Sequence, residues 1–455
     1  MTNDHRKEIN KRTKAFGAVS LGIPVCADVF IFQKTILNFK MYTRYLILLF
    51  LAVARCQQGG DIDSIIKEIW TTTSTTPKVN ERGPSTLVPG VIPTNNAQQN
   101  RTSCMTPDNK EGVCVNYYLC DPDYNTVITD GVGLIDIRLN DVEGPCPSYM
   151  DTCCLVGHTV TTPVTPKPTV KRDGCGWRNP NGVGFVAVGA TQNETQFGEF
   201  PWVVAILRIE PVNDNEPDGQ KLNVYVGGGS LIHPSVVLTA AHYVAQANAL
   251  RVRAGEWDTQ NTKEPYPFQD RDVENVVIHE DFNAGNLFYD IALLFLAEPM
   301  DTTAPNVGVV CLPPPKYVTP PGTRCFAAGW GKDKFGKEGR YQVILKKVEV
   351  PVVDHATCQS RLRQTRLGKF FELHSTFMCA GGEAGQDTCK GDGGSPLVCP
   401  IQNEPDRYMQ SGIVAWGIGC GGDGTPGVYV NVANLRDWVE SKVSVKYETS
   451  AYKNN

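Results

Sequence analysis

The chain has 455 residues, a formal net charge of −5 and 20% charged residues. Its length allows more than one domain, and the lack of a basic run with interleaved aromatic residues argues against nucleic-acid binding. The 16 cysteines are the unusual part of the composition, and they indicate an oxidising compartment, where disulfides form and persist.

The first informative segment begins at Met41. Residues 1–40 show no clear hydrophobic period, and we interpret them as an extension upstream of the true initiator. A short basic start then leads into the apolar run Tyr45–Ala54, the pattern of a secretory signal peptide over 41–56. The run is short for a membrane span, so a type II anchor is the weaker alternative, and no later stretch is apolar enough to cross a bilayer.

A polar linker, 57–103, precedes a cysteine-dense module, 104–154. The linker is rich in Thr, Pro, Asn and Gln and cannot bury much apolar surface. The module is too short for a large core, so crosslinks must hold it together. Its six cysteines are Cys104, Cys114, Cys120, Cys146, Cys153 and Cys154. Six cysteines permit fifteen pairings, and a small disulfide knot of another kind or a metal site is also possible.

A second linker, 155–174, leads to a large domain over 175–446, followed by a tail, 447–455. The domain's apolar runs are short, β-rich and punctuated by Gly, Pro and Asn, which favours an all-β barrel or sandwich. Apolar residues at helical spacing after Asn434 predict one helix at the end of the domain. Without Cys26 in the extension and Cys56 at the cleavage region, fourteen cysteines remain, enough for seven disulfides.

The large domain carries motifs in a fixed order. They are Leu238–His242, Asp290–Leu294, Gly329–Gly331, Cys389–Cys399 and Ile413–Gly417. In this order they make the domain similar to the chymotrypsin-like serine proteases over its full length. The resemblance implies two six-stranded antiparallel β-barrels with a C-terminal helix. It also implies that His242 is the general base and Asp290 the group that orients it.

The position of the attacking serine is occupied by Gly393. Because glycine has no side chain, the mechanism lacks its nucleophile, and we predict that the domain is not an enzyme. Ser395 lies two residues further on, roughly 6–7 Å along an extended chain, and is a weak candidate for rescue. An active trypsin-like protease is therefore the least favoured alternative.

Further positions depart from the family. Ala415 replaces the serine that supports the orienting Asp, and Gly227 and Tyr243 stand where the family has a disulfide beside the catalytic His. Family members gain a new amino terminus on activation, and it pairs with the Asp of the nucleophile loop. The corresponding stretch, Val186–Ala190, has no basic residue before it. Asp392 is therefore predicted to lack an ammonium partner.

Part of the substrate pocket is retained. Asp387 stands where trypsin-like enzymes carry the acid that binds Arg or Lys, and Gly417 and Gly427 match the glycines that keep the pocket open. The N–H groups of Gly391 and Gly393 are placed to form an oxyanion hole. The sequence leaves two interpretations equally open, a retained Arg/Lys-binding groove and an inherited scaffold without a ligand.

The small module resembles the clip domain of arthropod extracellular proteases, because of the adjacent Cys153 and Cys154. The two resemblances together imply a set of disulfides. These are Cys104–Cys153, Cys114–Cys146, Cys120–Cys154, Cys175–Cys311, Cys325–Cys399, Cys358–Cys379 and Cys389–Cys420. No cofactor is expected. The acidic loop 256–272 lies where some trypsins bind calcium, but a solvated loop is the favoured interpretation.

A clip module before a nucleophile-less protease domain resembles the arthropod clip-domain serine protease homologues, and most of all the masquerade-like prophenoloxidase-activating cofactors. This resemblance implies a haemolymph protein that helps an active clip protease to activate prophenoloxidase in melanisation. It also implies cleavage of the protein itself and homo-oligomerisation afterwards. A microbial-surface adhesion protein is the alternative.

Processing and glycosylation add five candidate positions. Arg82 and Arg101 are basic sites in the first linker, and Arg172 lies in the second; we favour the first linker slightly. Asn100 and Asn193 begin N-glycosylation triplets, which suit a secreted protein.

Overall fold

The computed structural model describes most of the chain from residue 102 onward. The described residues are 102–125, 127–129, 132–137, 145–165, 172–189, 193–211, 221–247, 249–332, 342–385, 388, 392–419 and 424–453. All of them belong to one compact unit, Asn96–Asn455. Several predictions fall outside the described residues: the signal peptide, the first linker up to residue 101, Arg82, Asn100, Arg101, Asp387, Gly391, and the pair Cys389–Cys420.

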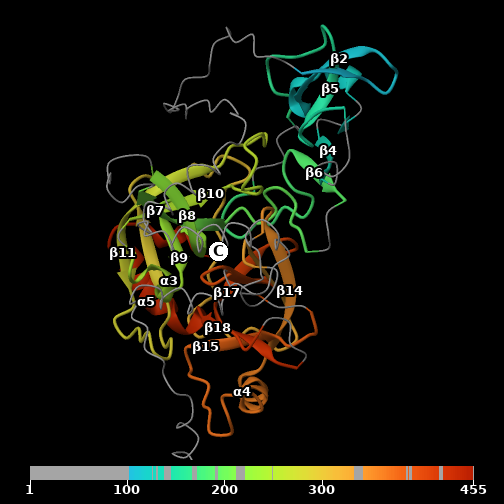
Figure 1. Ribbon diagram of the computed structural model, residues 1–455. Helices are drawn as coiled ribbons and strands as arrows, with labels where there is room; N and C mark the ends of the chain where they lie inside the picture. The colour runs from blue at the N-terminus through green and yellow to red at the C-terminus, as the bar shows by residue number, and fades with distance from the viewer. Residues whose placement is uncertain are drawn as a thin grey trace, which may run out of the picture. The chain divides into compact units, whose positions relative to one another are not determined.

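The first barrel closes in the strand order β10-β11-β12-β9-β8-β7 (Figure 1). Its strands are β7 (Val203–Pro211), β8 (Lys221–His233), β9 (Val236–Thr239), β10 (Leu250–Ala254), β11 (Gln269–Ile278) and β12 (Ala292–Leu296). All neighbours are antiparallel, and β12 and β9 are buried along their whole length. These are the continuous apolar runs of the sequence, because a strand inside a covered barrel wall needs no polar face.

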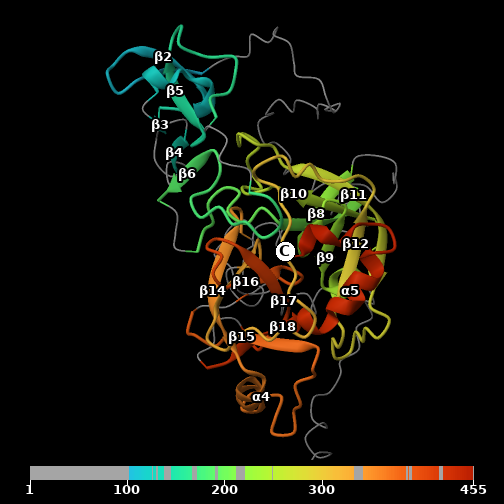
Figure 2. The ribbon, with the colours of Figure 1, turned by 180° about the vertical axis from the view of Figure 1, so that it is seen from behind.

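The second barrel closes in the order β13-β14-β15-β18-β17-β16 (Figure 2). Its strands are β13 (Arg324–Gly329), β14 (Lys346–Val353), β15 (Phe377–Gly381), β16 (Pro396–Pro400), β17 (Tyr408–Trp416) and β18 (Pro426–Asn431). One helix, α4 (His355–Arg363), follows β14, and its first turn is capped by Asp354, which accepts from the N–H of Thr357 at 2.9 Å. The predicted all-β fold of two six-stranded barrels is confirmed.

The predicted C-terminal helix is α5 (Arg436–Val443), which follows the short 3₁₀ turn η6 (Ala433–Leu435). It packs on the first barrel by burying Val439 and Val443. At its exposed edge, the indole N–H of Trp438 donates to Glu280 at 2.8 Å. The predicted tail contains another 3₁₀ turn, η7 (Thr449–Tyr452), whose Tyr452 side chain is buried.

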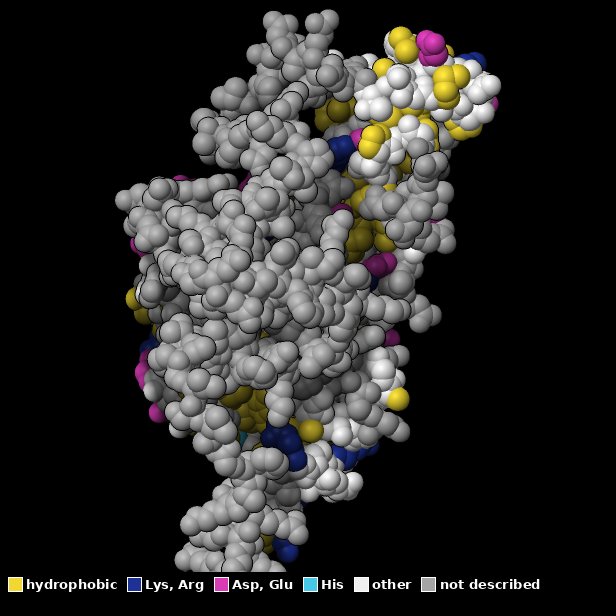
Figure 3. Space-filling model, in the orientation of Figure 1, with side chains coloured by type: hydrophobic (Ala, Val, Ile, Leu, Met, Phe, Trp, Pro, Cys, Tyr) yellow, Lys and Arg dark blue, Asp and Glu magenta, His cyan; other side chains and the backbone are white. Residues whose placement is uncertain are grey.

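The clip module is built on a three-stranded antiparallel sheet in the order β1-β2-β5. The strands are β1 (Ser103–Met105), β2 (Glu111–Asn116) and β5 (Asp151–Leu155), and two 3₁₀ turns, η3 (Tyr117–Leu119) and η4 (Pro122–Tyr124), follow β2. Its core is small, centred on Tyr117 and Met150, and hydrophobic side chains reach its surface (Figure 3). Disulfides therefore supply much of its stability.

Six disulfides lie within the described residues, and they join the same partners that the two resemblances implied. They are Cys104–Cys153, Cys114–Cys146, Cys120–Cys154, Cys175–Cys311, Cys325–Cys399 and Cys358–Cys379. Among the described residues, the one group of side chains close enough to share a metal ion is Cys104, Cys114 and Cys146. All three are oxidised, so the alternative of a metal site in the module is not supported here.

A second small sheet joins the module to the large domain. It contains β3 (Ile128–Thr129), β4 (Val132–Asp136) and β6 (Phe185–Val188), and β4 runs parallel to β6 from Gly133↔Phe185 to Asp136↔Val188. Strand β6 covers most of the stretch that the resemblance matched to the activation segment of an active protease. This stretch is therefore an internal strand paired with the clip module.

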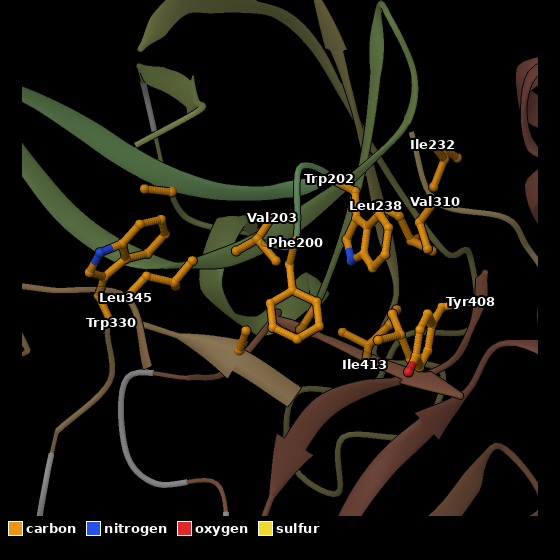
Figure 4. Packing of buried hydrophobic residues seen from close by; sticks show 14 of the residues in the cluster. Phe200, Trp202, Val203, Ile232, Leu238, Val310, Trp330, Leu345, Tyr408 and Ile413 are labelled. Atoms are coloured by element: carbon orange, nitrogen blue, oxygen red, sulfur yellow. The ribbon is translucent and has the colours of Figure 1, made fainter. Parts of the chain in front are cut away.

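The cores of both barrels meet between the sheets (Figure 4). Phe200, Trp202 and Leu238 approach from the side of the first barrel, and Tyr408 and Ile413 approach from β17 of the second. Each fully buried side chain of this size contributes roughly 1.5–3 kcal/mol relative to an exposed one. This shared core fixes the two halves of the candidate site against each other.

Candidate functional site

His242 and Asp290 retain the geometry of a catalytic pair. His242 lies in the short helix α3 (Ala241–Val244) directly after β9, and Asp290 precedes β12, which pairs with β9. The His242 Nδ1 and Asp290 Oδ2 atoms are 2.6 Å apart, and the His242 backbone N–H donates to Asp290 Oδ1 at 2.8 Å. Asp290 is fully buried. The carboxylate therefore holds the imidazole in the orientation that a general base requires.

The space beside Gly393 is filled by the side chain of Tyr243. A Cβ atom built on Gly393 would lie 2.5 Å from both Cζ and the hydroxyl oxygen of Tyr243, closer than real Cβ contacts. The Tyr243 ring also packs beside the His242 ring, with centroids 4.1 Å apart. The nucleophile is thus missing from the chain, and the ring of a neighbouring residue occupies its place.

Gly227 provides the room for this ring. A Cβ atom on Gly227 would lie 3.2 Å from Tyr243 Cγ and 2.8 Å from the carbonyl oxygen of Gly393. The next residue, Gly228, donates its N–H to that same carbonyl at 3.0 Å. Gly227, Tyr243 and Gly393 therefore form one contact cluster. The resemblance already paired the positions of Gly227 and Tyr243. Sequence reasoning missed the contact of the Tyr243 ring with Gly393, although altered residues at all three positions were a usable signal.

Ser395 cannot act as the nucleophile in this geometry. It is fully buried, and its Oγ has no hydrogen-bond partner among the described residues. That Oγ lies on the core side of the loop, 2.9 Å from where a Cβ on Gly329 would be. A substrate carbonyl has no path to this atom, so the weak rescue alternative finds no support.

The Asp392 carboxylate, which pairs with the new amino terminus in active proteases, accepts a backbone hydrogen bond here. Gly331 donates its N–H to Asp392 Oδ1 at 2.9 Å. The stretch that would supply the new amino terminus is held in β6 by the clip module.

The comparisons with known proteins agree with this geometry. The sequence matches the trypsin family over residues 190–439 and the family described as serine protease Clip domain PPAF-2 over 101–155. The chain belongs to the clip-domain serine protease homologues. It is 74% identical to phenoloxidase-activating factor 2 of Galleria mellonella over 285 residues, which is 62% of this chain and 94% of that protein.

Two other relatives extend the comparison. The inactive CLIP domain-containing serine protease A3 of Aedes aegypti is 42% identical over 358 residues, covering 74% of this chain and 68% of that protein. Protein masquerade of Drosophila melanogaster is 35% identical over 265 residues, covering 57% of this chain and 23% of that protein. With relatives named inactive and a glycine at the nucleophile position, this clip-domain homologue is a pseudoprotease.

The substrate pocket is only partly described. Gly427 lies in β18 opposite Ala380, and Gly417 directly follows β17. Ala415 is nearly buried in β17. Since Asp387 lies outside the described residues, the choice between a retained Arg/Lys-binding groove and an inherited scaffold without a ligand stays open. Among the described residues, no helix is long and apolar enough to cross a membrane.

The acidic loop 256–272 contacts the clip module. Asp258 accepts a hydrogen bond from the Tyr149 hydroxyl, and the Lys263 ammonium lies 2.6 Å from Asp151 of β5. Burial raises the pKa of Glu264 to about 7, and neighbouring Glu256 and Asp258 contribute to the rise. Burial also raises the pKa of Glu256 to about 6, against the opposing effect of Arg253. Calcium binding stays the less favoured and untested alternative for this loop, and two of its charged groups have partners in the module.

Proposed function

We propose that this pseudoprotease is a secreted haemolymph cofactor that promotes cleavage of prophenoloxidase by an active clip protease. The observation that carries the proposal is the Tyr243 ring over Gly393, beside a His242–Asp290 pair that keeps its geometry. A domain that has lost its nucleophile but kept its fold acts by binding. The high identity with phenoloxidase-activating factor 2 of Galleria mellonella supports the pathway.

The proposal includes activation of the cofactor by a cut in the first linker, at Arg82 or Arg101. The alternative at Arg172 is less suitable, because its guanidinium donates to the carbonyl of Arg178 at 3.1 Å and lies 5.3 Å from the centre of the Trp177 ring. A protease that cuts after Arg must take this side chain into its own pocket. Cleavage there would first have to break both contacts.

A cut in the second linker would also release little. The Cys175–Cys311 disulfide ties the end of that linker to the large domain, and β4 of the module pairs with β6 beyond the cut. A cut in the first linker would instead free a new amino terminus ahead of the clip module. Amino-terminal sequencing of the processed protein tests this, and a cut inside 183–190 would contradict it.

Reconstitution tests the proposed function. Purified, processed protein is added to prophenoloxidase and its activating protease, and phenoloxidase activity is measured. We expect activity to rise well above that of the protease alone, while a fluorogenic Arg substrate shows no turnover by this protein alone. No rise would reject the cofactor role and favour the adhesion alternative. Turnover that is abolished by Ser395→Ala would reject the pseudoprotease assignment.

Sedimentation of the protein before and after processing tests the remaining part of the proposal, homo-oligomerisation. We expect a larger species to form only after the cut. A monomer under both conditions would reject homo-oligomerisation, and the cofactor role would then be tested by the reconstitution alone.

A further inference from the structure

The loop that follows α4 gathers positive charge in an acidic chain. Residues 361–372 contain the four cations Arg361, Arg363, Arg366 and Lys369 but one carboxylate, Glu372, whereas the whole chain has a net charge of −5. Phe370 lies at the outer end of this loop and is 84% exposed. In the space-filling view, Lys and Arg side chains gather at the end of the second barrel where Figure 1 draws α4 (Figure 3).

These four cations form no ion pair with any described carboxylate. Many surface cations elsewhere in the large domain are paired. Examples are Arg251–Asp272 at 2.7 Å, Arg253–Asp270 at 2.8 Å, Arg324–Glu383 at 2.8 Å and Lys446–Glu274 at 2.8 Å. The end of α4 and the loop after it therefore carry positive charge that no described carboxylate pairs with.

Part of this charge has a local explanation. Arg361 and Arg363 lie in the last turn of α4, where cations offset the negative end of the helix dipole. Arg366 and Lys369 lie beyond the helix and are exposed, so the dipole does not account for them. Together with Phe370 they form what we call the basic knob, defined as Arg366, Lys369 and Phe370.

The knob is held by ordered contacts. Arg363 Nε donates to the Phe371 carbonyl at 2.8 Å, and the Leu373 N–H donates to the Gln359 side chain at 2.9 Å. The Phe371 ring packs edge-on against Trp416, with centroids 6.1 Å apart. Phe371 is thus anchored inward while its neighbour Phe370 faces solvent. The exposure of Phe370 is a property of the fold, and an exposed aromatic side chain held this way is ready for contact with a partner.

We propose that the basic knob is a docking site for an acidic segment of a protein partner, with Phe370 entering an apolar contact at its centre. Arg and aromatic residues dominate the energetics of protein interfaces, and complementary charge speeds encounter. Phe371, the neighbour of Phe370, packs on Trp416 beside Gly417, a position that the resemblance assigns to the substrate pocket. As a contact surface of the proposed cofactor, this docking site rests on the proposed function.

A polypeptide fits the knob better than a membrane does. Binding to a membrane surface requires a broad apolar face together with several cations, whereas the knob offers one exposed aromatic ring beside two cations. One ring and two charges match a short acidic segment that contains a single apolar residue. Binding should weaken with salt, since the exposed charges are screened within about 8–10 Å at physiological ionic strength.

A charge-reversed and truncated variant, Lys369→Glu with Phe370→Ala, tests the proposal. The matched control is Lys316→Glu with Val318→Ala, because Lys316 and Val318 are also exposed and lie in another surface loop. Thermal unfolding first establishes that both variants fold like the wild type. The probe is a labelled synthetic peptide rich in Glu and Asp with one central Leu, and its binding is followed by fluorescence anisotropy at low and physiological salt.

We expect the knob variant to bind this peptide about tenfold more weakly than the wild type, and the control to bind it within about twofold. Equal binding by all three proteins, or no binding by the wild type at low salt, would overturn the proposal. Binding that depends on the knob for phosphatidylserine vesicles but not for the peptide would also overturn it, by assigning the surface to membranes.

The reconstitution separates this proposal from the proposed function. If wild-type protein stimulates phenoloxidase activation and the knob variant stimulates it equally, the knob plays no part in cofactor action and the proposal fails. If the wild type does not stimulate activation, the cofactor role fails, and the peptide titration alone decides whether the knob binds acidic segments.

Discussion

Two contacts in this molecule are stabilised by different forces: the packing of Tyr243 against Gly393, and the contact between the clip module and the acidic loop 256–272. At Gly393 an aromatic ring fills the space of a missing side chain, and the contact is mainly steric. At the module, Tyr149 and Asp151 meet Asp258 and Lys263 through hydrogen bonds and charge. The first contact should therefore be insensitive to pH and salt, and the second should respond to both.

Restoring the serine gives the largest expected effect. Gly393→Ser places a side chain against the Tyr243 ring, so we expect a loss of about 2–3 kcal/mol in the free energy of unfolding from overpacking. We expect no hydrolysis of an Arg substrate. Urea unfolding and a fluorogenic assay measure the two outcomes.

The matched test is the same change in a Tyr243→Ala background. There the serine has room, so its cost should fall to under about 1 kcal/mol, giving a coupling of 1–2 kcal/mol between the two positions, roughly the range seen for residues in contact. Additive effects of the two changes would contradict a steric contact between Tyr243 and residue 393.

The difference between the two contacts also explains what could be predicted from the sequence. Short apolar runs between turns predict an all-β barrel or sandwich, and the family resemblance implies the two barrels and the roles of His242 and Asp290. The orientation of the Tyr243 ring could not be predicted in this way, because it depends on the absence of a side chain at Gly393, far away in the chain, as well as at Gly227.

The contacts of the clip module with the large domain could not be predicted from the sequence for another reason. Strand β4 pairs with β6 across some fifty residues, and Tyr149 meets Asp258 across a separation of 109. Strands of four or five residues with mixed composition carry no sequence pattern that identifies a distant partner strand. The module's disulfides were available only because its cysteine spacing resembled a known family.

The charged contact should respond to pH through Glu264. Its pKa is raised from 4.5 to about 7 in the folded protein, so the native state binds more protons than the unfolded state between these values. Stability from this group is therefore greatest below pH 4.5 and falls as the pH rises to 7. Glu264→Gln should stabilise the protein by about 1–2 kcal/mol at pH 8 and have little effect at pH 4.

Glu280 is a control of opposite sign. The ammonium of Lys442 holds its pKa at about 2, so its contribution is present above the unfolded pKa and is lost as the pH falls. Glu280→Gln should lower the melting temperature slightly at pH 7. The same pH response for both variants would show that the proposed linkage at Glu264 is wrong.

A smaller effect is expected at Tyr149. Burial raises the pKa of its hydroxyl, which therefore stays protonated and donates to Asp258. Tyr149→Phe should cost about 1 kcal/mol, since Asp258 keeps the N–H of Gln260 at 3.0 Å as a partner. Urea unfolding measures the loss. The rate of amide hydrogen exchange in β4 should rise in the same variant. An unchanged rate would show that the Tyr149–Asp258 hydrogen bond does not help to hold the module on the large domain.

The smallest effect is expected at the ion pair between Lys263 and Asp151. Lys263 is 41% exposed, and partly exposed pairs of this kind contribute about 0.2–1 kcal/mol, less at high salt. Lys263→Ala should therefore lower stability by about 0.5 kcal/mol at low salt, and the difference should vanish near 1 M salt. The Gly393→Ser penalty, measured in parallel, should not change with salt. If both penalties shifted together, the division into a steric and a charged contact would fail.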